Sequence, residues 1–368
     1  MLKRLRSYLL LTLCLGCALS TAGQHLHAGF DAREYEELLL ISARQGDTPW
    51  RHAKTPLPAS RLAYRAPVTG LKNRWDLWIR PDGVGIISIR GTTGEAASWM
   101  ENFYAGMITA QGSIHLNDST DFHYCVAKDS AAYVHAGWMI GLASMAPDIV
   151  QHIKASYREG IHEFIIVGHS QGGAIAFLLR SYLSYLDDPA LPKDIVYKTY
   201  CSAAPKPGNL YYAYDFDHLT HDGWGFRVVN ARDWVPETPF SLQTVSDFNA
   251  VSPFPYVKPI LKKQKLLVRW VRRSMYNKLD RSSRKASRRM ARTLGPTLGK
   301  RVCQSLPGYV QPPFVQSNAY MTAGSPVILQ PTPAYYAQFP FDGKNIFIHH
   351  MMEPYLFLLH AQYAEAFP

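Results

Sequence analysis

Between residues 60 and 250 the chain alternates between two patterns. One is a short continuous run of apolar residues, and the other is a longer segment in which apolar residues recur at helical spacing. The clearest pair is an apolar run at 164–167 followed, after a glycine-rich turn, by a helical pattern from Gly173 to about Leu186. Other apolar runs, at 84–90, 195–202 and 226–230, each lead into a polar loop. Strands that alternate with helices in this way predict an α/β fold with a doubly wound, mostly parallel sheet and helices on both of its faces.

Other elements are predicted from local signals. Alternating runs at 74–80 and 84–90 flank Pro81-Asp-Gly, which predicts an antiparallel hairpin. Helical spacing predicts helices from an N-cap at Asp31, from Val134 to about Tyr157, and at the C-terminus. The segment 96–114 predicts a short amphipathic helix with flexible ends, and two interpretations stay open: a mobile lid or a permanently docked helix. The Pro-rich stretch 306–340 predicts irregular loop.

The N-terminus has the composition of a secretory signal. A basic start, Lys3–Arg6, precedes an apolar run at 8–19 and then small residues, which predicts a signal peptide over 1–23 that is too short to span a membrane stably. Acylation of Cys17 is an alternative, although Cys14 stands three residues before it, where a lipobox usually has Leu. We therefore expect the mature chain, 24–368, to be a single exported domain.

The net charge of +11 is concentrated in one segment. Residues 258–301 hold sixteen Lys or Arg and a single acid, Asp280, so this segment carries +15 and the rest of the chain −4. Leu267, Val271, Met275 and Leu279 recur every four residues there, which predicts one or two cationic amphipathic helices, with a Ser-rich break, in an insertion over 257–302.

The mature chain keeps three cysteines, Cys125, Cys201 and Cys303, so a disulfide framework is excluded and at most one internal bridge, such as Cys125–Cys303, can form. We find no Cys/His cluster with metal-ligand spacing, and the chemistry considered below requires no metal or organic cofactor.

The sequence indicates a catalytic serine at the end of the run 164–167, which is followed by Gly168-His-Ser170-Gln-Gly172. A strand, a sharp turn with glycines on both sides of a serine, and a helix predict a nucleophile elbow with Ser170 at its apex. A serine hydroxyl needs an adjacent base, usually a histidine oriented by a carboxylate, and in α/β-hydrolase chains these follow in the order Ser, acid, His.

This order restricts the partners of Ser170. Asp233 follows an apolar strand and is expected at the same sheet edge as the serine, whereas other acids lie in the opposite loop (Asp187, Asp188, Asp194) or in a polar connection (Asp215, Asp217, Asp222). His350 is the favoured base, with His349 and His360 as alternatives. The backbone N–H of Gln171 and the turn Arg90-Gly-Thr92 are predicted to stabilise the oxyanion. His135 and His169 are interpreted as structural.

Six motifs together resemble the class 3 lipase family of α/β-hydrolases. They are Ile89-Arg-Gly-Thr92 with Trp99, Val134-His-Ala-Gly-Trp138, Gly168-His-Ser-Gln-Gly-Gly173, Pro205-Lys-Pro-Gly-Asn209, Arg227-Val-Val-Asn230 with Asp233-Trp-Val-Pro236, and His350-Met-Met-Glu-Pro-Tyr355. The resemblance implies an α/β-hydrolase fold, Ser170 as nucleophile with Asp233 and His350, Thr92 and Gln171 as oxyanion donors, ester hydrolysis and a lid after Thr92. The chain departs from the family at Cys201-Ser-Ala203 and in the long stretch between Asp233 and His350.

Three functional hypotheses follow. The first is an exported serine ester hydrolase, a lipase or carboxylesterase, that cleaves acyl esters of lipids such as acylglycerols. The second is a phospholipase A1 whose segment 258–301 binds an anionic membrane surface, against the simpler interpretation of a solvated surface excursion. The third is a non-catalytic envelope-binding protein on a hydrolase fold. A nucleic-acid partner is disfavoured in an exported protein, and the sequence does not determine the oligomeric state.

Overall fold

A seven-stranded sheet forms the centre of the computed structural model, which describes residues 24–46, 54–189, 191–249, 251–256, 262 and 265–367. The strands lie in the order β1-β2-β3-β8-β9-β11-β13, and all neighbours from β3 to β13 are parallel. The strands are β1 (Arg61–Arg65), β2 (Trp75–Ile79), β3 (Gly85–Ile89), β8 (Glu163–His169), β9 (Val196–Ser202), β11 (Gly225–Asn230) and β13 (Ser325–Leu329). The antiparallel pairing of β2 with β3 confirms the predicted hairpin.

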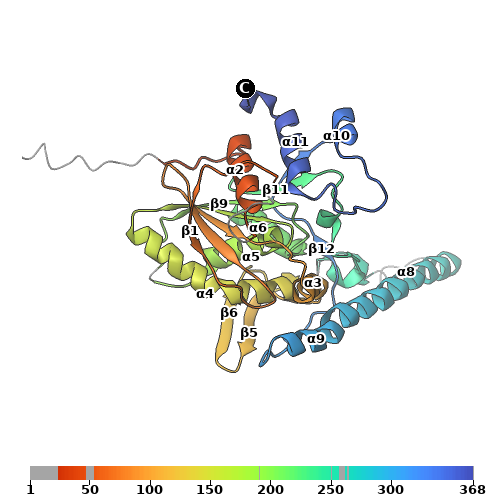
Figure 1. The fold of residues 1–368 in the computed structure, drawn as a ribbon. Coiled ribbons are helices and arrows are strands. Elements are labelled where there is room, and N and C mark those ends of the chain that lie inside the picture. Colours follow the sequence, from red (N-terminus) through yellow and green to blue (C-terminus); the bar gives the residue numbers. More distant parts are fainter. Residues whose placement is uncertain are drawn as a thin grey trace, which may run out of the picture.

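Helices cover both faces of this sheet (Figure 1). On one face, α4 (Ala136–Arg158) and α5 (Gln171–Tyr185) pack over side chains such as Phe164 and Ile166. On the other face, α2 (Ala32–Ser42) and α11 (Met352–Gln362) pack over Ile165 and Val167. Because adjacent residues of β8 point to opposite faces, a continuous apolar run serves two cores. The expected doubly wound α/β fold is confirmed.

Smaller elements surround the main sheet. A second sheet has the order β12-β10-β7-β4, and β5 and β6 form a separate hairpin. These strands are β4 (Met107–Thr109), β5 (Gln111–Asn117), β6 (Thr120–Cys125), β7 (Tyr133–His135), β10 (Gly208–Asn209) and β12 (Tyr320–Met321). The remaining helices are α3 (Ala96–Phe103), α6 (Leu210–Leu219), α8 (Leu266–Arg292), α9 (Leu298–Ser305) and α10 (Pro333–Gln338). Short turns are η1 (Val235–Glu237), η2 (Val245–Asp247), η3 (Phe254–Tyr256), the π-helical η4 (Thr293–Thr297) and η5 (Ala364–Ala366).

The structure corrects four local predictions. The helix expected over 96–114 ends at Phe103 and is followed by β4 and β5. The stretch 306–340 is not irregular throughout, because it supplies β12, α10 and β13, the edge strand of the main sheet. The Ser-rich break is absent, because α8 runs through Ser282 and Ser283. Cys125, Cys201 and Cys303 are all unpaired, so no Cys125–Cys303 bridge forms.

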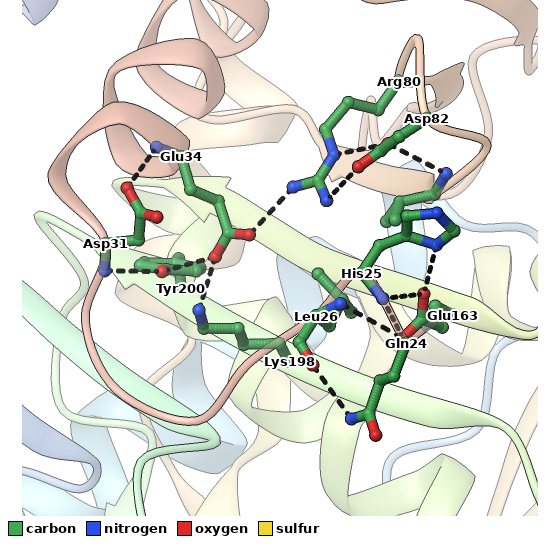
Figure 2. A network of polar contacts seen from close by, with 11 residues as sticks. Gln24, His25, Leu26, Asp31, Glu34, Arg80, Asp82, Glu163, Lys198 and Tyr200 are labelled. Carbon is green, nitrogen blue, oxygen red and sulfur yellow. Dashed lines mark hydrogen bonds and ion pairs between the residues drawn. The ribbon is translucent and has the colours of Figure 1, made fainter. Parts of the chain in front are cut away.

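The amino ends of β8 and β9 are tied to the N-terminal segment by charged contacts (Figure 2). The backbone N–H groups of His25 and Leu26 both donate to the Glu163 carboxylate at 2.9–3.1 Å. Glu34 of α2 accepts from Lys198 Nζ at 2.7 Å and from Arg80 at 2.9 Å. This polar network lies at the sheet edge opposite to the carboxyl ends of the parallel strands, and so leaves that other edge for chemistry.

The predicted signal peptide, 1–23, lies outside the described residues. Among the helices that the structure does describe, none has the length and apolar content needed to cross a membrane.

Candidate active site

Ser170 lies in a strained turn between β8 and α5. Its backbone has φ 61° and ψ −129°, a conformation that residues with a side chain rarely adopt. A Cβ at Gly168 would lie 2.1 Å from the Gly172 carbonyl oxygen, and one at Gly172 would lie 2.2 Å from the Ile89 carbonyl oxygen. Only glycine fits at either position, so the spacing of the two glycines is what allows the strand, the turn and neighbouring β3 to pack this closely.

Asp233 and His350 form a buried pair. His350 Nδ1 lies 2.7 Å from Asp233 Oδ2, and the two side chains are 9% and 0% exposed. The carboxylate also accepts from the Tyr355 hydroxyl at 2.8 Å and from the Val235 N–H at 3.0 Å. An ionised carboxylate can only accept, so it holds the proton of His350 on Nδ1 and leaves Nε2 as the basic nitrogen.

This pair is attached to the residue that precedes Ser170. His169 Nε2 donates to the His350 carbonyl oxygen at 2.7 Å, and its Nδ1 lies 3.0 Å from Ser202 Oγ. Ser202 in turn bonds the Tyr35 hydroxyl at 2.6 Å. Among the described residues no hydrogen bond joins Ser170 Oγ to the His350 ring, and such bonds often form fully only when substrate binds. The structure therefore brings Ser170, His350 and Asp233 to one edge of the sheet.

The alternative partners of Ser170 are bound elsewhere. His349 Nδ1 contacts the Tyr335 hydroxyl at 2.7 Å, and His360 Nε2 contacts Glu36 at 2.6 Å. Residues 346–350, which carry both His349 and His350, form turns. Most of the other acids are bound far from the turn, and the pairs are Asp188 with Lys154, Asp194 with Tyr157, Asp215 with Tyr185 and Asp217 with the Gly324 N–H.

The two groups predicted to stabilise the oxyanion both lie next to Ser170 and have a donor available. Gln171 is the first residue of α5, so its backbone N–H has no acceptor within the helix. Thr92 follows the turn in which a Cβ at Gly91 would lie 3.6 Å from Ser170 Cβ. Asn102 Nδ2 donates to Thr92 Oγ1 at 2.8 Å, so the threonine hydroxyl accepts in this bond and keeps its own proton for another acceptor.

Helix α3 lies over this site and is held by polar contacts. Ser98 Oγ donates to the Gln171 side chain at 3.2 Å, and the buried Glu101 accepts from Asn73 Nδ2 at 2.8 Å. Burial raises the pKa of the Glu101 carboxyl well above its usual range. Trp99 also contacts Phe347, which precedes His350. The structure thus presents α3 as docked, and its movement as a lid stays a prediction.

Three supporting residues were not predicted from the sequence. Tyr355 orients Asp233, Asn102 positions Thr92, and Ser202 supports His169. Tyr355 could have been found from the sequence, because it is the last residue of the motif His350-Met-Met-Glu-Pro-Tyr355 that resembles the family. Asn102 and Ser202 have no such signal in the sequence, because the partner of a buried polar residue is known only from the folded chain.

Two neutral histidines should make the protein sensitive to mild acid. Burial lowers the pKa of His169 and of His135 to about 3 each, below the unfolded value of roughly 6.5. Between these values the unfolded chain binds protons that the folded chain excludes, so the free energy of unfolding falls as pH drops below about 6.5, by up to about 1.4 kcal/mol per pH unit per histidine. Urea unfolding at several pH values should show this fall, and His169→Gln should reduce its slope. Equal slopes for the two proteins would contradict the assignment to His169.

Comparison with known proteins finds a family match over the central part of the chain. Residues 86–243 match the family model described as lipase (class 3). A secreted mono- and diacylglycerol lipase, MDL2, of Malassezia globosa is 33% identical over 104 residues, which cover 28% of this chain and 32% of that protein. The chain therefore matches about a third of the length of this curated relative.

A structural comparison also finds solved fungal lipases, all with low sequence identity to this chain. The Rhizomucor miehei triacylglyceride lipase has a TM-score of 0.39 and 17% identity, over 58% of this chain and 77% of that one. A Penicillium expansum triacylglycerol lipase has a TM-score of 0.42 and 16% identity, over 57% and 75%. The family match spans the elbow, the Thr92 turn and Asp233, so this part of the chain, 86–243, is similar to the class 3 lipase family.

Proposed function

We propose that this protein is an exported serine ester hydrolase that cleaves acyl esters of lipids through an acyl-enzyme on Ser170. The observation that carries the proposal is the buried Asp233–His350 pair, with its 2.7 Å hydrogen bond, attached through His169 to the strained turn that presents Ser170. A general base oriented by a carboxylate beside a serine on a tight turn is the arrangement that nucleophilic acyl transfer requires.

The residues divide the reaction into two steps. His350 Nε2 removes the Ser170 proton as Oγ attacks the ester carbonyl, and the resulting oxyanion is bound by the Gln171 N–H and the Thr92 hydroxyl. The same imidazolium then protonates the leaving alcohol, and the acyl group stays on Ser170. Water, deprotonated by His350, releases the fatty acid and restores the serine. Asp233 remains ionised and stabilises the imidazolium in both steps.

Acylglycerols are the favoured substrate class. The curated relative is named as a lipase of mono- and diacylglycerols, which supports an exported enzyme acting on glycerol esters. Exposed apolar side chains on the segments that carry the site also suit an acyl chain. Phe103 is exposed on α3, and Ile346 and Met351 are exposed on either side of His350 in the sequence. The Trp99 ring connects the two segments, because it contacts both Phe103 and Phe347. Exposed apolar groups that gather at one place often mark a binding surface for an apolar ligand.

Phospholipid is the second candidate substrate, supported by the cationic helix α8. The non-catalytic alternative is disfavoured, because each of the predicted catalytic positions carries a competent residue and two of them form the expected hydrogen bond.

Fatty-acid release from a panel of substrates tests the proposal. We expect the purified mature chain to hydrolyse p-nitrophenyl esters and mono-, di- or triacylglycerols, and a fluorophosphonate should label Ser170, as located by peptide mass spectrometry. A fluorophosphonate reacts with an activated serine whatever the acyl chain, so the label separates a wrong substrate class from an inactive site. Absence of both hydrolysis and labelling would overturn the proposal.

A further inference from the structure

Helix α8 has apolar residues on the side that faces away from the protein. Figure 1 shows this helix extending from the body. Val271, Met275 and Leu279 are 43%, 62% and 72% exposed and follow one another every four residues. The buried Asp280 and Ser287 lie on a different side of the helix, about 130° around its axis from the centre of the stripe, since successive residues turn by about 100°. An exposed apolar stripe on a helix this basic is the pattern of helices that lie in a membrane interface.

A basic pocket lies on one flank of α8. It has a volume of about 550 Å³ and lies between the helix and the segment around η2. Its lining includes Arg281, Arg284, Lys285 and Arg288 from α8 with the hydroxyl-bearing Thr244 and Ser246. Arg284 is bound to Asp280, but among the described residues no carboxylate pairs with the other three basic side chains. The pocket therefore has uncompensated positive charge next to hydroxyl groups.

Ser287 points to a ligand in this pocket. Its side chain is 2% exposed and lines the pocket, and its Oγ has no hydrogen-bond partner among the described residues. A buried hydroxyl without a partner costs free energy unless something binds it. The Thr244 hydroxyl already donates to Asp247 at 2.7 Å. The guanidinium groups, the ammonium group and the Ser246 and Ser287 hydroxyls around this space still form the donor set typical of sites that bind phosphate.

We propose that this pocket binds the phosphate of an anionic phospholipid headgroup while the apolar stripe of α8 enters the same membrane. The inference rests on the proposed function and specifies its partner, a membrane surface of anionic phospholipid. Helical geometry supports it, because the pocket residues lie between the exposed stripe and the buried side, at the height that headgroups would occupy.

The α8 segment is also fixed to the active-site side of the molecule. Helix α9, which continues α8 through η4, packs against α3. Gly106, just after α3, donates its N–H to the Leu294 carbonyl oxygen at 3.1 Å, and Gly299 packs on the Tyr104 hydroxyl. A membrane bound by α8 would therefore be held at a fixed orientation to α3 and to the site that α3 covers.

Vesicle binding by the mature full-length chain tests the proposal. The Ser170→Ala variant is used as the background, so that hydrolysis cannot alter the lipid. Sedimentation should show tighter binding to phosphatidylcholine vesicles that contain phosphatidylglycerol than to phosphatidylcholine alone. Arg281→Gln/Arg288→Gln removes two pocket charges, and Arg272→Gln/Arg289→Gln removes two exposed charges of α8 outside the pocket.

Both double variants should bind more weakly, but by different factors. Electrostatic attraction to an anionic surface strengthens binding roughly fivefold for each basic residue near it. Each double variant should therefore bind the vesicles about 25-fold more weakly through this effect. The pocket pair should lose about a further tenfold, because charged hydrogen bonds to phosphate are also lost. Ser287→Ala should weaken vesicle binding severalfold without lowering the melting temperature, which a merely structural serine would not do.

Three results would overturn the proposal: equal losses for the two double variants, no preference for phosphatidylglycerol, or saturation of the pocket by inorganic phosphate without such a preference, which would assign it to free phosphate. In the Ser170-containing protein, hydrolysis of a soluble p-nitrophenyl ester should be the same with and without the α8 substitutions. That assay reports the proposed activity separately, so loss of docking and absence of esterase activity are distinguishable.

Discussion

Replacing Ser170 with alanine should lower kcat/KM for p-nitrophenyl and glycerol esters by at least about 10⁴-fold and towards 10⁶-fold. The acyl-enzyme cannot form without Oγ, and what remains is the stabilisation offered by the Gln171 N–H and Thr92. The fold should persist, because the turn is built by Gly168 and Gly172 and not by the serine hydroxyl. We expect the free energy of unfolding to change by less than about 1 kcal/mol in urea.

Ser184→Ala is the matched control for this change. Ser184 lies on the same helix, α5, near its far end, where its hydroxyl donates to the Arg180 carbonyl oxygen. This variant should retain full activity and full fluorophosphonate labelling, whereas Ser170→Ala should lose both. Retention of more than a tenth of the activity by a folded Ser170→Ala protein would show that another residue is the nucleophile.

The central sheet and the elbow could be predicted because their causes are local. The apolar run of β8 buries side chains on both faces of the sheet. Glycine is required at 168 and 172 because a Cβ there would clash with backbone atoms a few residues away or on the adjacent strand. The order of Ser170, Asp233 and His350 also selected the pair that the structure joins at 2.7 Å. Periodicity and turn chemistry were therefore sufficient for this part of the fold.

Elements that depend on distant pairing could not be predicted. Strand β13 begins Ser325-Pro326, which is typical of loop, yet it pairs in parallel with β11 about a hundred residues earlier in the chain. Proline is tolerated there because β13 is an edge strand. Strand β4, read as helix from its sequence, is likewise defined by its pairing with β7. In both cases tertiary contacts overrode the local signal.

The orientation of polar side chains was also beyond the sequence. His349 and His350 are adjacent in the sequence, and their order alone does not say which ring contacts Asp233. In the structure they lie in turns, and the two rings have different partners, because Tyr335 binds His349 and Asp233 binds His350. Burial raises the pKa of Tyr355, aided by the Asp233 charge, so this residue stays a protonated donor to that carboxylate.

Asp233→Asn should reduce kcat by about 10⁴-fold with little change in KM. An asparagine amide can donate to His350 Nδ1, which favours the tautomer with the proton on Nε2. That nitrogen is then no longer able to accept the Ser170 proton, and the imidazolium that forms during attack also loses its compensating charge. Steady-state kinetics on a soluble ester measure both parameters.

The same substitution at Asp194 provides the control, because this acid lies at the opposite end of the sheet and binds only Tyr157 and His162 among the described residues. Asp194→Asn should change kcat less than about twofold, in line with an exposed site away from the chemistry. Tyr355→Phe should fall between the two, since it removes one of three donors to Asp233 but leaves the carboxylate and its bond to His350. If Asp233→Asn kept more than a tenth of the activity, the buried pair would have to be a structural contact, and the base for Ser170 would have to be sought among the remaining histidines.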